Sequence, residues 1–93
     1  MPRSSIETRT VYLRRIDLAE NARRWYGLHV TRSLFGDHLL VRTWGRLGSN
    51  GVREAVETHA RPDDARRSLR AWLSAKTRRG YEIVDGDPDQ TTP

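Results

Sequence analysis

Apolar and polar residues alternate along the first two thirds of the chain in a way that predicts β-strands. In the second alternating segment, Tyr26, Leu28 and Val30 fall on one face, because successive side chains of a strand point to opposite sides. A turn around Gly36 and another at 48–51 separate the later segments, with glycine where a positive φ is expected. The predicted strands cover residues 10–16, 23–32, 38–46 and 52–58.

The period of the pattern becomes that of a helix after residue 61. Apolar residues then recur at three- and four-residue steps, and Trp72 lies on this apolar stripe. Pro62 suits a first helical turn, and Gly80 is a typical helix stop. Residues 62–79 are therefore predicted to form a helix, and residues 81–84 a short final strand.

These elements predict one α+β domain. An antiparallel sheet of four to five strands carries one α-helix packed on one face, which leaves the other face open. A chain of 93 residues has room for a single core. We expect a flexible N-terminus at 1–9, a folded domain at 10–84 and a disordered acidic tail at 85–93.

The net charge of the chain narrows the range of binding partners. Residues 1–84 hold seventeen basic and nine acidic residues, a formal charge of +8, because three of the twelve acidic residues lie in the last nine positions. A small body with this charge attracts polyanions, and the usual ones are nucleic acids and acidic membranes. Sixteen of the seventeen basic residues are arginine. This bias fits both a GC-rich genome and phosphate recognition by guanidinium groups, and composition does not separate the two.

The sequence contains no pattern typical of a catalytic or cofactor site. It has no cysteine, which excludes disulfides, thiolate metal sites and a cysteine nucleophile, and which fits a reducing cytoplasm. Its three histidines match no zinc spacing, and its glycines form neither a dinucleotide fingerprint nor a phosphate-binding loop. No apolar run approaches the length of a membrane helix, and no secretory leader precedes the first strand. We therefore expect a cytoplasmic protein that is not an enzyme and uses no metal or cofactor.

The third strand carries a candidate contact site. Its two-residue period puts Trp44 on the same face as Arg42 and Arg46. The indole offers a surface for a base or a sugar, and the guanidinium groups can clamp phosphates on either side. Gly45 gives the chain room beside the ring or permits a bulge. The alternative, favoured by Leu40 on the same face, is that Trp44 packs on the sheet and the arginines reach outward at its edge.

At Trp44-Gly45-Arg46 the chain resembles the WGR domain, a family named after this tripeptide. The surrounding sequence is similar as well, over about residues 10–84. The matching features are Asp17 and Asn21 before the aromatic pair Trp25-Tyr26, the turn Leu34-Phe35-Gly36, the continuation Leu47-Gly48 with Gly51, the helix from Ala65 to Lys76-Thr77, and the closing Gly80-Tyr81. The chain departs from the family pattern at His38 and Val52, where tryptophan and glutamine are common.

The resemblance implies an antiparallel sheet with one helix and a nucleic-acid-binding function. In the DNA-dependent poly(ADP-ribose) polymerases that carry this domain, DNA ends or breaks are the target. The motif tryptophan rests there against the terminal sugar, and the motif arginine approaches the phosphate. Those roles pass to Trp44 and Arg46.

We therefore predict a nucleic-acid site, with DNA preferred over RNA, ends or single strands preferred over the duplex interior, and no membrane as partner. Its residues are Trp44, Gly45, Arg46, Arg42 and Lys76. We expect the indole to project from the face that the helix leaves open. A protein-interaction module that uses the same tryptophan and arginine surface is the alternative, and the sequence leaves the oligomeric state open.

Overall fold

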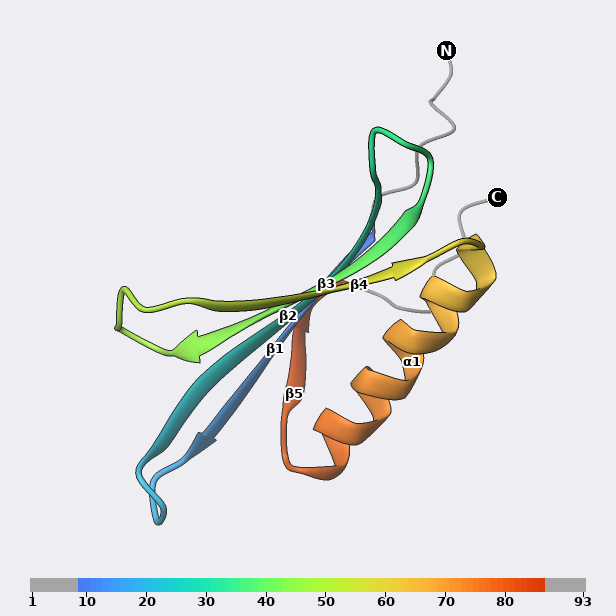
Figure 1. Cartoon of the computed structure of the whole chain (residues 1–93). Helices are drawn as coiled ribbons and strands as arrows, with labels where there is room; N and C mark the ends of the chain where they lie inside the picture. Colours follow the sequence, from blue (N-terminus) through green and yellow to red (C-terminus); the bar gives the residue numbers. More distant parts are fainter. Residues whose placement is uncertain (1–8, 87–93) are drawn as a thin grey trace.

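The computed structural model describes residues 9–86, which form one sheet and one helix (Figure 1). The elements are β1 (Arg9–Asp17), β2 (Ala22–Arg32), β3 (His38–Arg46), β4 (Arg53–His59), α1 (Pro62–Arg78) and β5 (Glu82–Asp85). Most of the predicted flexible N-terminus and acidic tail falls on residues 1–8 and 87–93, which lie outside the described residues. Within the described range, Arg9 opens β1 and Asp85 closes β5.

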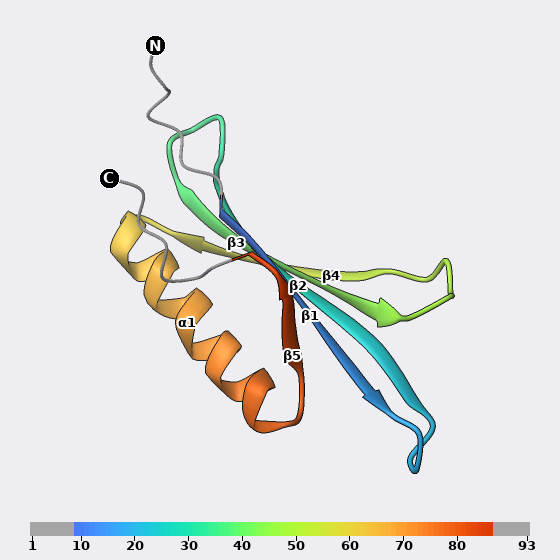
Figure 2. The same cartoon turned by 180° about the vertical axis from the view of Figure 1, so that it is seen from behind.

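The sheet is antiparallel throughout, with strand order β4-β3-β2-β1-β5. The first four strands form a meander in chain order, and α1 then carries the chain from the β4 edge to the β5 edge. Figures 1 and 2 show that α1 covers one face of the sheet, here called the helix face, and leaves the reverse face bare. The prediction of an α+β fold with one helix on a four- to five-stranded antiparallel sheet is confirmed.

The hydrophobic core lies between α1 and the helix face. The strands contribute alternate residues, which are buried because the side-chain period of a strand is two. The buried apolar residues of the cluster are Val11, Leu13, Tyr26, Leu28, Val30, Leu40, Ala65 and Leu69. Each fully buried leucine stabilises the fold by about 1.5–3 kcal/mol relative to an exposed one. Trp44, Trp72, Leu73 and Tyr81 pack around this core and are partly buried.

The ends of α1 follow from its terminal residues. Pro62 occupies the first turn, where its missing N–H loses no hydrogen bond, and Asp63 and Asp64 complement the positive end of the helix dipole. Gly80 takes a φ of 98°, and the N–H of Tyr81 donates to the carbonyl of Lys76 at 3.1 Å. Because residues 79–81 form this turn, the helix ends one residue earlier than predicted and β5 begins one residue later.

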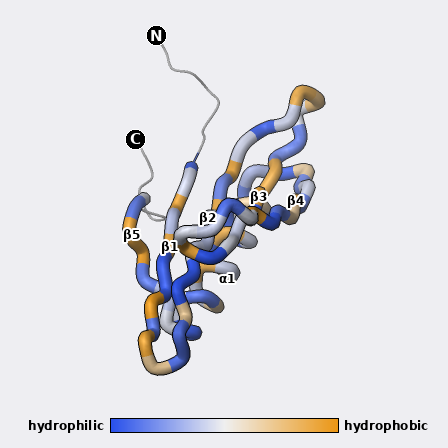
Figure 3. Tube along the Cα trace, turned by 90° about the vertical axis from the view of Figure 1, so that its left-hand side faces the viewer, coloured by the Kyte–Doolittle hydropathy of each residue, from blue (hydrophilic) through white to orange (hydrophobic). Residues whose placement is uncertain are grey.

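The two ends of the sheet differ in their surroundings. The β1–β2 and β3–β4 turns project away from α1 (Figure 1). At the opposite end, the tip of the β2–β3 hairpin is hydrophobic (Figure 3), with Leu34 100% and Phe35 92% exposed. The Ser33 hydroxyl fixes this tip by accepting hydrogen bonds from the N–H groups of Phe35 at 3.1 Å and Asp37 at 3.2 Å.

Candidate functional site

Trp44 lies on the helix face, so the expected projection of its indole from the open face is wrong. The register pairs Trp44 with Tyr26, and residues paired directly across antiparallel strands share a face. Tyr26 belongs to the core, and its ring stacks on the indole with centroids 5.8 Å apart and planes 13° apart. The ring is only partly buried, however. Trp44 stands two residues before the end of β3, next to the β3–β4 turn that projects away from α1 (Figure 1).

Aromatic rings and cationic groups alternate across the helix face at this place. The guanidinium of Arg42 lies 3.9 Å from the ring centroid of Trp72 and 5.6 Å from that of Trp44. The Lys76 ammonium lies 4.3 Å from the ring centroid of Tyr26 and 5.5 Å from that of Tyr81. Such cation–π contacts stabilise a desolvated cation against an aromatic face. They join α1 to β2 and β3 and fix the position of Trp44.

Arg42 is engaged within the protein. Its Nη1 donates a hydrogen bond to the Tyr26 hydroxyl at 3.0 Å, and its Nε lies 3.9 Å from Oε2 of Glu57. That Nε is buried and has no hydrogen-bond partner among the described residues. The guanidinium is thus held between the indoles of Trp72 and Trp44. Its predicted role as a phosphate clamp stays a prediction, and its contacts are those of a side chain that positions Trp44.

Glu57 supplies the carboxylate that lies beside the Arg42 guanidinium. Its carboxylate accepts hydrogen bonds from the Ser68 hydroxyl, from Trp72 Nε1 at 2.9 Å and from His59 Nε2 at 3.1 Å. Burial by itself raises the pKa of the Glu57 carboxyl, but these donors and the His59 charge outweigh it and place the pKa below its usual value. Glu57 therefore stays ionised beside Arg42 and ties β4 to α1.

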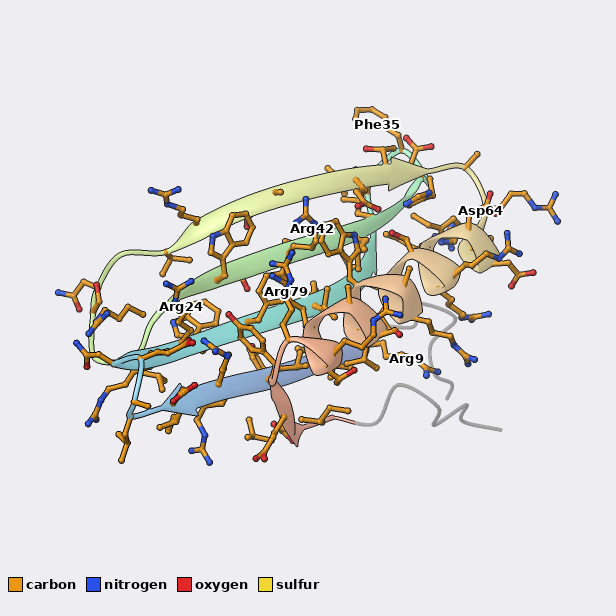
Figure 4. The ribbon with its side chains drawn as sticks, turned by 90° about the horizontal axis from the view of Figure 1, so that it is seen from below. Arg9, Arg24, Phe35, Arg42, Asp64 and Arg79 are labelled. Carbon is orange, nitrogen blue, oxygen red and sulfur yellow. The ribbon has the colours of Figure 1, made fainter. Side chains whose placement is uncertain are left out.

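Three adjoining hollows lie on the helix face near the ends of β2 and β3, and Trp44 lines two of them. Arg24 lines all three, and the middle one has a volume of about 290 Å³. We call them together the basic cleft. Among the described residues that line it there is no acidic side chain, and the basic ones are Arg15, Arg24, Arg42, Arg46, Arg53, Lys76 and Arg79. In Figure 4, Arg24, Arg42 and Arg79 come from β2, β3 and the end of α1 toward this cleft.

Lys76 shows the electrostatic consequence of this lining. Burial lowers the pKa of its ammonium group, and the positive charges of Arg79, Arg42 and Arg24 lower it further. The charged form of Lys76 is therefore disfavoured by its surroundings. A bound anion would remove that penalty, because an opposite charge nearby favours the protonated amine.

Gly45 has a packing role. A Cβ on this residue would lie 2.7 Å from the Gly51 carbonyl oxygen and 2.9 Å from Trp25 Nε1. Since side chains alternate along a strand, Trp25 and the absent side chain of Gly45 face the reverse side of the sheet. The indole of Trp25, whose role the sequence left open, lies over Gly45, and no side chain fits there.

The structure places all five predicted residues around the basic cleft. Trp44, Gly45, Arg42 and Lys76 line the middle hollow, and Arg46 lines the hollow next to it. The cleft is also lined by residues that the prediction did not name, namely Arg15, Arg24, Trp25, Tyr26, Gly51, Val52, Arg53, Arg79 and Tyr81. Only strand pairing could have indicated Arg24, which stands opposite Arg46 on β3 and opposite Arg15 on β1.

Two other features are absent from the described range 9–86. No helix there is long and apolar enough to cross a membrane. No group of three or more histidine, cysteine, aspartate or glutamate residues could hold a metal ion in that same range.

Comparison with known proteins adds two similarities. A family model described as WGR domain matches residues 9–87. A protein of Sinorhizobium fredii (strain NBRC 101917 / NGR234), named "Uncharacterized protein y4dW", is 34% identical over 83 residues, which are 89% of this chain and 40% of that protein. The chain thus spans less than half the length of this relative.

Proposed function

This chain belongs to the WGR domain family, a family of binding rather than catalytic domains that generally bind nucleic acid, and on that premise we propose that it binds DNA through the basic cleft beside Trp44. The observation that carries the proposal is the lining of the cleft, with seven basic residues and no acidic one among the described residues. Arg15 and Arg42 form ion pairs with Glu20 and Glu57 outside this lining, so the charge available to a ligand comes from the other five. Such a surface attracts the phosphate backbone and releases counterions when it binds.

Within the cleft we assign a role to each predicted residue. The exposed part of the Trp44 indole takes a sugar or an unpaired base, and Arg46 and Lys76 contact phosphates. Gly45 lets Trp25 pack beneath the motif. Arg42, which is already held by Tyr26 and Trp72, keeps the Trp44 indole in place.

Strand ends and single strands fit this cleft better than the interior of a duplex. A stacked base pair hides the faces of its bases, so an indole fixed on a sheet reaches only an unpaired base or a terminal sugar. RNA offers the same faces and phosphates, and its preference relative to DNA is part of the test.

The experiment is a fluorescence anisotropy titration with a labelled 12-nucleotide single-stranded DNA, a blunt duplex and an RNA of the same sequence. Removing one stacked base contact is expected to cost about 1–3 kcal/mol, so Trp44→Ala should weaken binding about 5- to 150-fold. Arg46→Gln, at an exposed position, should weaken it with no loss of stability. Arg32→Gln, which removes the same charge at the far end of β2, is the matched control.

The salt dependence of DNA affinity provides a second criterion for the proposed site. Arg24, which lines all three hollows, is the third phosphate contact that we assign. Each phosphate contact on a single strand contributes about −0.7 to the slope of log K against log salt, so contacts at Arg24, Arg46 and Lys76 give a slope of about −2. The proposal is wrong if no probe binds at low salt. The assignment of the site is wrong if Arg46→Gln and Arg32→Gln have the same DNA affinity and if folded Trp44→Ala binds DNA as tightly as the wild type.

A protein-interaction function has support from a different part of the molecule. Leu34 and Phe35 are almost fully exposed at the hairpin tip, and exposed large apolar side chains on an ordered turn are typical of contact anchors. Failure of every nucleic-acid probe, together with a stoichiometric protein partner that is lost in the double variant Leu34→Ser/Phe35→Ser, would favour this function.

A further inference from the structure

Consecutive residues of β1 and β2 send the same type of side chain to both faces of the sheet. Arg14 and Arg15 are neighbours on β1, and Arg23 and Arg24 are neighbours on β2. Since side chains alternate, Arg15 and Arg24 line the basic cleft while Arg14 and Arg23 face the reverse side. In the next pair, the ring of Tyr26 lies on the helix face and that of Trp25 on the reverse face.

Trp25 therefore occupies on the reverse face a position like that of Trp44 on the helix face. It stands between Arg14 on β1 and Gly45 on β3, and Arg23 precedes it by two residues on the same face. Its indole lies over Gly45, where a Cβ would come within 2.9 Å of Nε1 and 3.2 Å of Cε2. One side of the ring thus packs on the sheet, and the partly exposed remainder faces outward.

The charges around Trp25 favour an anionic partner. Arg14 and Arg23 are both exposed. The nearest acidic residue by register is Glu82 of β5, which stands opposite Arg14 at the sheet edge, and Glu54 of β4 stands opposite Thr43, one row further along this face. The patch of Arg14, Arg23 and Trp25, here called the reverse patch, thus carries two positive charges beside one partly exposed indole, with Glu82 at its outer side and Glu54 one row away.

The reverse patch lies directly behind the basic cleft, on the opposite face of the sheet. Along β2 and β3 the row of Trp25 and Gly45 lies between the row of Arg24 and Arg46 and the row that contains Trp44. The indoles of Trp25 and Trp44 thus lie on opposite faces of the sheet, near the start of β2 and the end of β3. The one helix of residues 9–86, α1, lies on the other face of the sheet (Figure 2) and so does not cover the reverse patch.

We propose that the reverse patch binds a second nucleic-acid strand, so that the domain holds the two separated strands of a forked DNA end on opposite faces of its sheet. This inference rests on the proposed function, in which the first strand occupies the basic cleft. A continuous duplex cannot place one strand on each face, whereas two unpaired arms can pass on either side of the sheet. The substrate class is therefore a splayed end, with Trp25 stacking on one arm and Arg14 and Arg23 contacting its phosphates.

The test compares three labelled DNAs that share one 15-base-pair duplex: a blunt end, one six-nucleotide single-stranded arm, and two non-complementary arms of that length. A second arm that only offered another copy of the same site would improve binding about twofold. Simultaneous occupation of both faces should improve it at least fivefold, the lower end of what one stacked base contributes.

The double variant Arg14→Gln/Arg23→Gln separates the two faces without removing a packed ring. In this variant the affinity for the two-armed DNA should be within twofold of that for the one-armed DNA. The affinity for the one-armed DNA should equal that of the control variant. The control, Arg32→Gln/Arg61→Gln, removes two exposed charges at the other end of the sheet and should keep the preference. Trp25→Phe, which keeps a ring on Gly45, should reduce the preference in part.

The outcomes distinguish this inference from the proposed function. If one-armed DNA binds through Trp44 and the second arm adds twofold or less, the reverse patch does not bind a strand and the basic cleft remains. If the preference for two arms persists in Arg14→Gln/Arg23→Gln, the assignment to these residues is overturned. If no DNA binds at low salt, the proposed function itself fails.

Discussion

The glycine of the Trp44-Gly45-Arg46 motif can be tested as a packing residue by Gly45→Ala. The new Cβ would lie 2.7 Å from the Gly51 carbonyl oxygen and 2.9 Å from Trp25 Nε1, whereas ordinary contacts begin at 3.4 Å, so these atoms must move by about 0.5–0.7 Å. The indole can tilt, but the carbonyl belongs to the backbone of a turn. Overpacking of this kind costs about 1–3 kcal/mol. A loss of about 2 kcal/mol would lower Tm by about 8–16 °C in a domain of this size.

Urea and thermal unfolding followed by circular dichroism measure this effect, and Gly51→Ala is the matched control in the same turn. The nearest atom to a Cβ on Gly51 is Ser49 Oγ at 3.6 Å, an ordinary contact. Gly51→Ala should therefore be neutral or slightly stabilising, because alanine restricts the unfolded chain. The reasoning is refuted if Gly45→Ala unfolds like the wild type, or if it loses DNA affinity while its stability is unchanged, which would make the glycine a site of close ligand approach.

Three further changes test the surroundings of the cleft. Glu57→Gln should lower the free energy of unfolding above about pH 5 and make it depend less on pH in the acid range, because a carboxyl with a lowered folded-state pKa contributes stability that is lost as pH falls through that pKa. Urea unfolding at a series of pH values measures both effects. Lys76→Met should weaken DNA binding and change the free energy of unfolding at pH 7 by less than about 1 kcal/mol, because the loss of the contacts with the Tyr26 and Tyr81 rings opposes the relief of burying a charge beside other cations; unchanged DNA binding would exclude a phosphate contact at Lys76. Leu34→Ser/Phe35→Ser should keep the wild-type Tm within about 2 °C, because both side chains are exposed in the folded domain; a large loss would show that the hairpin tip is part of the core.

Much of the fold could be predicted from the sequence because local signals agree with one another. Tyr26, Leu28 and Val30 mark one face of β2, and all three are buried. Pro62 and Gly80 mark the limits of α1 to within two residues. In such places alternation, helical period and turn residues all indicate the same structure.

The orientation of Trp44 could not be predicted in the same way. β3 has apolar residues on both sides, with Leu40 on one and Leu39 and Val41 on the other, so its own pattern does not select the core face. The register with β2 decides the matter, because it pairs Trp44 with the buried Tyr26. Leu40, which is fully buried, was the correct signal in the sequence, and the flanking arginines were the misleading one.

Arg42 and Arg46 show why residue type alone does not assign a role at the site. Both stand two positions from Trp44 on one face, and the sequence gives them the same prediction. Arg42 lies toward α1, where Trp72, the Tyr26 hydroxyl and Glu57 hold its guanidinium. Arg46 lies at the uncovered end of the strand and lines the cleft. The difference depends on where the helix crosses the sheet, and no local pattern contains that information.

The basic cleft also connects the stability of the domain to its binding. Burial first, and then the charges of Arg79, Arg42 and Arg24, lower the pKa of Lys76 in the free protein, so like charges at this point of the cleft disfavour its protonated form. A polyanion that binds there provides the missing opposite charges, and binding to the folded state alone raises the free energy of unfolding. The stabilisation of the domain by DNA should therefore fall steeply with salt, whereas the Glu57 network, which contains its own acid, should depend on salt much less. The charges that disfavour protonated Lys76 in the free domain are thus compensated when a phosphate backbone lies among them.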